Sequence, residues 1–136
     1  MSDKWRVLIA EDDPDWQELA GENLSKTKDY EITFAGSLFE VDTLLRQERT
    51  FDIALVDLGL GGYKNFNMQG GKDAAIRLQQ QTDAKVGLFS AITNQEARQI
   101  ARELGVPLFD KTKYDGFDNM LKETLHWNLN VHREHE

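Results

Sequence analysis

The chain has 136 residues and a formal net charge of −8, with 40% hydrophobic and 29% charged residues. This acidic balance argues against direct nucleic-acid binding, which needs basic patches, and the absence of cysteine excludes disulfides, thiolate metal sites and cysteine nucleophiles. The longest aliphatic run, 7–10, is too short to span a bilayer and no signal-peptide core follows Met1, so we expect a cytoplasmic protein that does not enter a membrane.

Hydrophobic periodicity and helix-capping signals predict five strands that alternate with five helices. The predicted strands cover residues 5–10, 30–34, 53–56, 85–89 and 106–109. The predicted helices cover residues 14–26, 38–45, 72–81, 93–104 and 115–129. Asp13 before Pro14 is typical of a helix start, and capping boxes begin at Ser37 and Thr93. Gly105 should end the fourth helix.

This alternation predicts an α/β fold with a doubly wound, five-stranded parallel sheet, flavodoxin-like, with strand order 2-1-3-4-5 and (βα)5 connectivity. Residues 1–130 should form a single domain, and 131–136 should be a frayed tail. The stretch 63–71 fits neither period and is interpreted as an extended loop. In such a sheet, ligands bind beyond the carboxyl ends of the strands, where the strand order reverses.

Polar residues follow four of the predicted strands at that edge. They are Glu11, Asp12 and Asp13 after the first strand, Asp57 after the third, Ser90 after the fourth and Lys111 after the fifth. Asp13 is best explained as a helix cap, and each of the others taken singly could be a turn residue or a solvated charge. Together, clustered carboxylates without His or Cys favour Mg²⁺, while Lys111 and Ser90 could meet an anionic group on Asp57. These parts suit phosphoryl transfer to an aspartate. The glycines that follow Asp57 lack the Lys-Ser/Thr pair of a P-loop.

The sequence resembles the receiver (phosphoacceptor) domain of two-component response regulators from Trp5 to about Leu129. The matching pieces are Val7-Leu-Ile-Ala-Glu-Asp-Asp-Pro14, Asp52-Ile-Ala-Leu-Val-Asp57, Ser90-Ala91 and Lys111. Each piece is weak alone, but four in the correct order at strand ends are specific.

The resemblance implies that a histidine kinase or phosphotransfer protein phosphorylates Asp57. It implies that Mg²⁺ is held by Glu11, Asp12, Asp57 and the backbone carbonyl of Gly59, and that Ser90 and Lys111 contact the phosphoryl group. Output would pass through protein contacts to a downstream protein, on the face built from segments 93–104, 106–109 and 115–129. The same face could form a homodimer.

Several positions depart from the family pattern. Gly61 and Thr112 stand where the family has prolines, and Leu108 stands where it has a switch aromatic, with Phe109 adjacent. The loop Gly61–Met68 is also longer than usual by about half a dozen residues, and it could cover the site or dock a partner. These departures leave open whether the Ser90–aromatic switch operates.

A second hypothesis is therefore a receiver-like interaction module that acts without phosphorylation. A third, a Mg²⁺-dependent phosphatase with an aspartyl-phosphate intermediate, ranks last because Gly59 stands where such enzymes have an acid/base aspartate. We expect no enzyme activity beyond self-phosphorylation and self-dephosphorylation. By the resemblance, Gly59 and Ile92 occupy the positions that influence attack by water. Neither side chain can orient a water molecule, so we expect slow autodephosphorylation.

Overall fold

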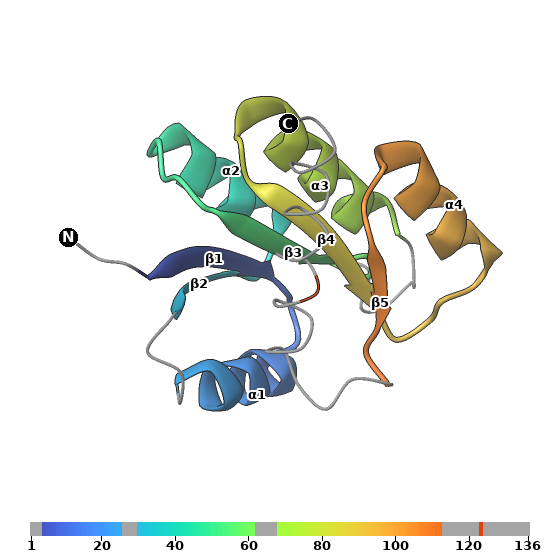
Figure 1. Cartoon of the computed structure of the whole chain (residues 1–136), viewed down its shortest axis with the longest axis horizontal. Coiled ribbons are helices and arrows are strands. Elements are labelled where there is room, and N and C mark those ends of the chain that lie inside the picture. Colours follow the sequence, from blue (N-terminus) through green and yellow to red (C-terminus); the bar gives the residue numbers. More distant parts are fainter. Residues whose placement is uncertain (1–3, 26–29, 62–67, 113–122, 124–136) are drawn as a thin grey trace.

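The protein is described from a computed structural model that covers residues 4–25, 30–61, 68–112 and 123 (Figure 1). The helix predicted over 115–129, the tail 131–136 and most of the loop predicted over 63–71 lie outside the described residues. Across the described ranges, no helix is long and apolar enough to cross a membrane.

Strands and helices alternate along the described chain. The strands are β1 (Trp5–Ala10), β2 (Tyr30–Ala35), β3 (Ile53–Asp57), β4 (Lys85–Ser90) and β5 (Leu108–Asp110). The helices are α1 (Pro14–Ser25), α2 (Leu38–Arg46), α3 (Gln69–Gln81) and α4 (Gln95–Leu104). All neighbouring strands pair in parallel in the order β2-β1-β3-β4-β5, which confirms the predicted doubly wound sheet.

Helices cover both faces of this sheet: α1 lies on one face, and α2, α3 and α4 lie on the other (Figure 1). The alternation of β1 explains the two cores, because successive strand residues point to opposite faces. Val7 and Ile9 enter the core on the α1 side, whereas Leu8 and Ala10 enter the core on the other side. All four are 0% exposed, and a strand buried on both faces needs this continuous apolar run.

The start of α3 differs from the prediction. The helix begins at Gln69, whereas the predicted start at Lys72 is wrong by three residues. Glycine normally disfavours helix, but here Gly70 and Gly71 let the first turn lie directly on the end of β3. A Cβ atom at Gly71 would lie 2.4 Å from the carbonyl oxygen of Asp57. Tertiary packing therefore decides this helix start, and it places α3 against the turn that follows Asp57.

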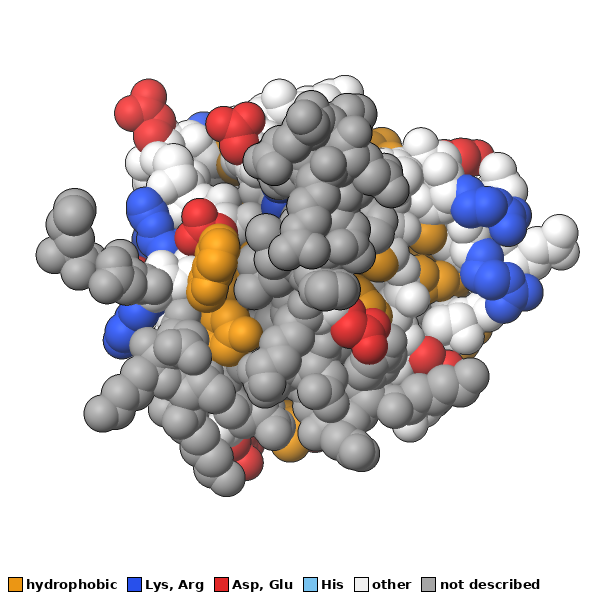
Figure 2. Space-filling model, in the orientation of Figure 1, with side chains coloured by type: hydrophobic (Ala, Val, Ile, Leu, Met, Phe, Trp, Pro, Cys, Tyr) orange, Lys and Arg blue, Asp and Glu red, His pale blue; other side chains and the backbone are white. Residues whose placement is uncertain are grey.

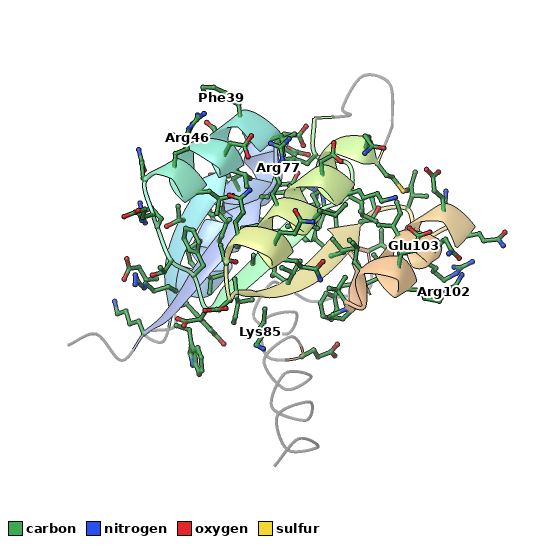
Figure 3. The ribbon with its side chains drawn as sticks, turned by 90° about the horizontal axis from the view of Figure 1, so that it is seen from above. Phe39, Arg46, Arg77, Lys85, Arg102 and Glu103 are labelled. Carbon is green, nitrogen blue, oxygen red and sulfur yellow. The ribbon has the colours of Figure 1, made fainter. Side chains whose placement is uncertain are left out.

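The predicted caps of α1 and α2 are present. The Asp13 side chain accepts a hydrogen bond from the Asp15 N–H at 2.9 Å, and the Ser37 hydroxyl accepts one from the Glu40 N–H at 3.1 Å. In a capping box the Glu40 carboxylate would also accept a hydrogen bond from the N–H of Ser37. Here it accepts from the N–H of Gly36, one residue earlier. Both helices therefore begin at their predicted residues. Figure 3 shows Arg77 on α3 directed toward α2, where it forms an ion pair with Asp42.

Two boundaries near α4 are wrong by one or two residues. Its N-cap is Asn94 rather than Thr93, whose hydroxyl instead lies 3.5 Å from Oδ2 of Asp110. Val106, the predicted start of the last strand, belongs to the turn that closes α4, because its N–H donates to the Ala101 carbonyl at 3.1 Å. Strand β5 is correspondingly short.

Candidate functional site

The switch point of the sheet brings two carboxylates together. Ala10 pairs with Val56 in the register of β1 and β3, so Glu11 and Asp57 come next on these adjacent strands. Glu11 is 1% exposed and Asp57 is 6% exposed. The ligand-binding edge predicted from the topology therefore carries two buried acidic side chains.

Lys111 reaches this pair from the strand at the edge of the sheet. Its backbone N–H donates to the carbonyl of Ser90 at 3.0 Å, which extends the pairing of β5 with β4 by one residue. Its Nζ atom lies 2.8 Å from Oε2 of Glu11 and 3.0 Å from Oδ2 of Asp57. Lys111 is only 7% exposed. Because buried charges attract strongly, this ammonium group compensates part of the negative charge of the two carboxylates.

The carboxylates at this edge accept hydrogen bonds from backbone N–H groups of the turns that follow β1 and β3. Glu11 Oε1 accepts from Asp13 at 3.0 Å, Asp57 Oδ1 accepts from Gly59 at 2.9 Å, and Asp12 Oδ2 accepts from Gly61 at 3.2 Å. One oxygen of each of the three side chains lies within 4.8 Å of the others. We call Glu11, Asp12 and Asp57 the acidic cluster.

Burial is the main reason that the pKa of Glu11 is raised from 4.5 to about 8. The charge of Asp57 and a hydrogen bond shared with it raise the pKa further, and Lys111 lowers it only in part. Oε2 of Glu11 is buried, and the ammonium group of Lys111 lies 2.8 Å from it. A divalent cation at this edge would favour the ionised form of Glu11 beyond what Lys111 achieves.

The acidic cluster fits a hard divalent cation. Its three oxygens are close enough for one ion, and hard oxygen donors are the ligands that Mg²⁺ and Ca²⁺ take in proteins. The burial of Glu11 beside the charge of Asp57, which Lys111 offsets only in part, supports the same assignment. These residues could therefore hold a divalent cation. The fourth predicted ligand is the backbone carbonyl of Gly59. The N–H of the same residue donates to the Asp57 carboxylate.

Ser90 lies at the end of β4 with 2% of its surface exposed. Its hydroxyl donates to the Ile92 carbonyl at 2.8 Å and accepts from the Ile92 N–H at 3.1 Å. The structure thus brings Glu11, Asp57 and Lys111 into contact, whereas the Ser90 hydroxyl is engaged in a local turn. A contact between Ser90 and a phosphoryl group remains a prediction.

Two residues beside the site are not identifiable from motifs. The side-chain amide of Gln17 donates to the Glu11 carbonyl at 2.6 Å and so fixes the turn that carries the acidic cluster. The ring of Trp16 lies 4.6 Å from Nζ of Lys111, measured to the ring centre. From the sequence, Trp16 is interpreted as core or partial core, and it does pack against the core on the α1 side. Its position on the first turn of the helix after Glu11 is the one signal that places it near the site.

Comparisons with known proteins agree with this architecture. No family model and no curated protein matches the sequence. A CheY-like response regulator receiver domain protein from Methanospirillum hungatei matches with a TM-score of 0.72 and 17% identity, over 98% of this chain and 99% of that one. A response regulator protein from Burkholderia pseudomallei, solved with a phosphorylated aspartic acid, a calcium ion and citrate, matches with a TM-score of 0.72 and 16% identity, over 98% and 76%. The non-phosphorylated HemR receiver domain from Leptospira biflexa matches with a TM-score of 0.67 and 27% identity, over 94% of both chains.

The sheet order and the acidic edge at its switch point define a doubly wound α/β domain with a candidate cation site. Its fold is that of response regulator receiver domains.

Proposed function

We propose that the protein is a two-component receiver domain that accepts a phosphoryl group on Asp57 in the presence of Mg²⁺. One observation carries the proposal: Asp57 shares the acidic cluster with Glu11 and Asp12 and lies 3.0 Å from the ammonium group of Lys111. A nucleophilic carboxylate next to a cation site and a lysine is what aspartyl phosphorylation requires.

In the proposed reaction, an oxygen of Asp57 attacks the phosphorus of a phosphohistidine on a histidine kinase or phosphotransfer protein. The new O–P bond forms as the P–N bond breaks, and its electron pair leaves with the imidazole nitrogen. Mg²⁺, held by Glu11, Asp12, Asp57 and the Gly59 carbonyl, would reduce the repulsion between carboxylate and phosphoryl oxygens. Lys111 would pair with those oxygens afterwards, because its ammonium group is a mobile point charge.

The protein would act by signalling rather than as an enzyme with a separate substrate. Its output would pass through α4, β5 and the segment 115–129 to a downstream protein or to a second copy. Charged side chains are exposed on the described part of this face, and Figure 2 shows blue Lys and Arg side chains at the α4 end of the view. Figure 3 labels Arg102 and Glu103 on α4, and Glu103 forms an ion pair with Lys72 of α3 at 3.5 Å. Such mixed charge favours a specific polar partner. A cytoplasmic location would suit an exchange with kinase domains.

Intact mass spectrometry tests the proposal. The protein is incubated with acetyl phosphate and Mg²⁺, and the same incubation is made with Asp57→Asn and with Asp52→Asn, a matched control at an exposed position on the amino side of β3. The wild type and Asp52→Asn should gain the mass of one phosphoryl group, and Asp57→Asn should not. No gain in the folded wild type, or an equal gain in Asp57→Asn, would refute the proposal.

One observation favours the second candidate, a receiver-like module that acts without phosphorylation. The Ser90 hydroxyl is engaged with the backbone of Ile92, so it would have to leave this turn to meet a phosphoryl group. Once a partner is found, its affinity for phosphorylated and unphosphorylated protein separates the two candidates. Equal affinities support the module, and a large difference supports a phosphorylation-controlled receiver.

A further inference from the structure

Lys111 contacts aromatic rings as well as carboxylates. Its Nζ atom lies 4.6 Å from the ring centre of Trp16 and 5.1 Å from that of Phe89. Both distances are within the range of about 6 Å in which a cation is attracted by the negative face of an aromatic ring. Phe89 is fully buried in β4, whereas Trp16 is partly buried on the first turn of α1. Among the described residues, the buried ammonium group therefore has two carboxyl and two aromatic partners.

The two carboxyl partners of Lys111 are also proposed cation ligands. Lys111 contacts Oε2 of Glu11 and Oδ2 of Asp57, and the other oxygen of each carboxylate already accepts a backbone N–H. A divalent cation bound by these carboxylates would compete with Lys111 for the same oxygens. The rings have no oxygen ligands and do not take part in this competition. They remain as contacts for the ammonium group when the carboxylates are engaged.

We propose that Trp16 is a positioning residue that holds the Lys111 ammonium group beside Asp57 while the acidic cluster is occupied. The proposal rests on the function proposed above, because a phosphoryl group on Asp57 is the anion that Lys111 would then meet. Trp16 acts through Lys111 and not on the phosphoryl donor. Tryptophan attracts a cation more strongly than phenylalanine, and an aliphatic side chain offers no ring face. The expected order at this position is therefore Trp, then Phe, then Leu.

Tryptophan fluorescence tests the contact without any phosphorylation. Emission spectra are compared for the wild type and Lys111→Met, and then for the same pair in a Trp16→Phe background. The loss of the lysine should change the emission of the wild type, and the change should vanish in the Trp16→Phe background because Trp16 is, among the described tryptophans, the one beside Lys111. An unchanged spectrum, or an equal change in both backgrounds, would overturn the proposal.

Phosphorylation kinetics with saturating acetyl phosphate and Mg²⁺ test the role. Trp16→Leu should reduce the maximal rate roughly threefold or more, and Trp16→Phe should recover most of the loss. In a Lys111→Met background, Trp16→Leu should cause no further slowing, because residues that act through one another are not additive. Trp5→Leu is the matched control, since Trp5 lies at the opposite end of β1 and is 44% exposed. Thermal melting verifies that each variant is folded.

Two outcomes would overturn the proposal. One is that Trp16→Leu slows phosphorylation equally in the wild-type and Lys111→Met backgrounds, which would show an independent structural effect. The other is that Trp16→Leu is phosphorylated at the wild-type rate. If the folded wild type is not phosphorylated at all, the proposed function fails instead. The fluorescence comparison then still decides whether Trp16 holds Lys111.

Discussion

The raised pKa of Glu11 predicts that Mg²⁺ binding depends on pH. A proton on Glu11 must leave before its carboxylate can bind a metal ion. With its pKa raised to about 8 in the metal-free protein, Glu11 is mostly protonated at pH 7 and more so at pH 6. A raised pKa favours the protonated form of Glu11, so Mg²⁺ affinity should increase with pH and level off above about 8.

The expected change is about tenfold in apparent affinity for each pH unit below the pKa, equivalent to about 1.4 kcal/mol. Isothermal titration calorimetry at pH 6, 7, 8 and 9 measures it. Titrations at pH 7 in buffers of different ionisation enthalpy should show net proton release on Mg²⁺ binding, and release should be small at pH 9. The emission of Trp16, 4.6 Å from Lys111, offers a second signal for the same binding event.

Two variants control for other causes. Glu11→Gln should bind Mg²⁺ more weakly, and its affinity should vary little with pH because the competing proton is gone. Glu103→Gln replaces an exposed glutamate on α4, whose pKa is lowered by its hydrogen bond to Gln99 and by Lys72, and it should behave as the wild type. An Mg²⁺ affinity that is the same in the wild type at pH 6 and pH 8 would refute the assignment of a protonated Glu11.

Three further predictions concern the same region. Lys111→Met should lower the melting temperature of the metal-free protein, because removing one partner of a buried ion pair costs about 3–5 kcal/mol. Mg²⁺ should then raise the melting temperature of this variant by more than it raises that of the wild type. Calorimetric melting with and without Mg²⁺ checks this, and an equal effect of Mg²⁺ on both proteins would contradict it. Gly71→Ala should destabilise by about 1–3 kcal/mol, since its Cβ would lie 2.4 Å from the Asp57 carbonyl oxygen. Gly21→Ala, a helical glycine with nothing within 4 Å of the added Cβ, should stabilise by about 0.5–1 kcal/mol in urea denaturation, and equal effects of the two changes would contradict this packing. Phosphorylated protein should lose its phosphoryl group slowly, and Ile92→Glu, at an exposed position, should shorten the lifetime measured by mass spectrometry; a lifetime of seconds that this variant leaves unchanged would contradict the expectation.

The sequence predicts the sheet and the residues at its edge because both follow from local patterns. In a parallel sheet the residue after each buried strand lies at the carboxyl edge, so the strand pattern alone is sufficient to place Glu11, Asp57 and Lys111 near one another. Asp13 and Pro14 likewise determine the start of α1 through capping alone.

Tertiary contacts decide what the sequence does not predict. The pair Gly70-Gly71 indicates a loop by propensity, yet packing against the turn after Asp57 makes it the first turn of α3. The protonation of Glu11 depends on burial and on Asp57, which is distant in sequence. Trp16 has the spacing of a core residue, and only the fold shows that its ring also contacts the lysine of the site.

Localisation of the phosphoryl group tests the central claim most directly. The protein is treated with acetyl phosphate and Mg²⁺, reduced with borohydride, which converts an aspartyl phosphate to homoserine, and mapped by peptide mass spectrometry. Homoserine should occur at position 57 and not at Asp12, in the same acidic cluster, or at Asp52, at the other end of β3. Reduction at either of those positions, or none at position 57 in protein that is folded and binds Mg²⁺, would contradict a phosphoacceptor role for Asp57.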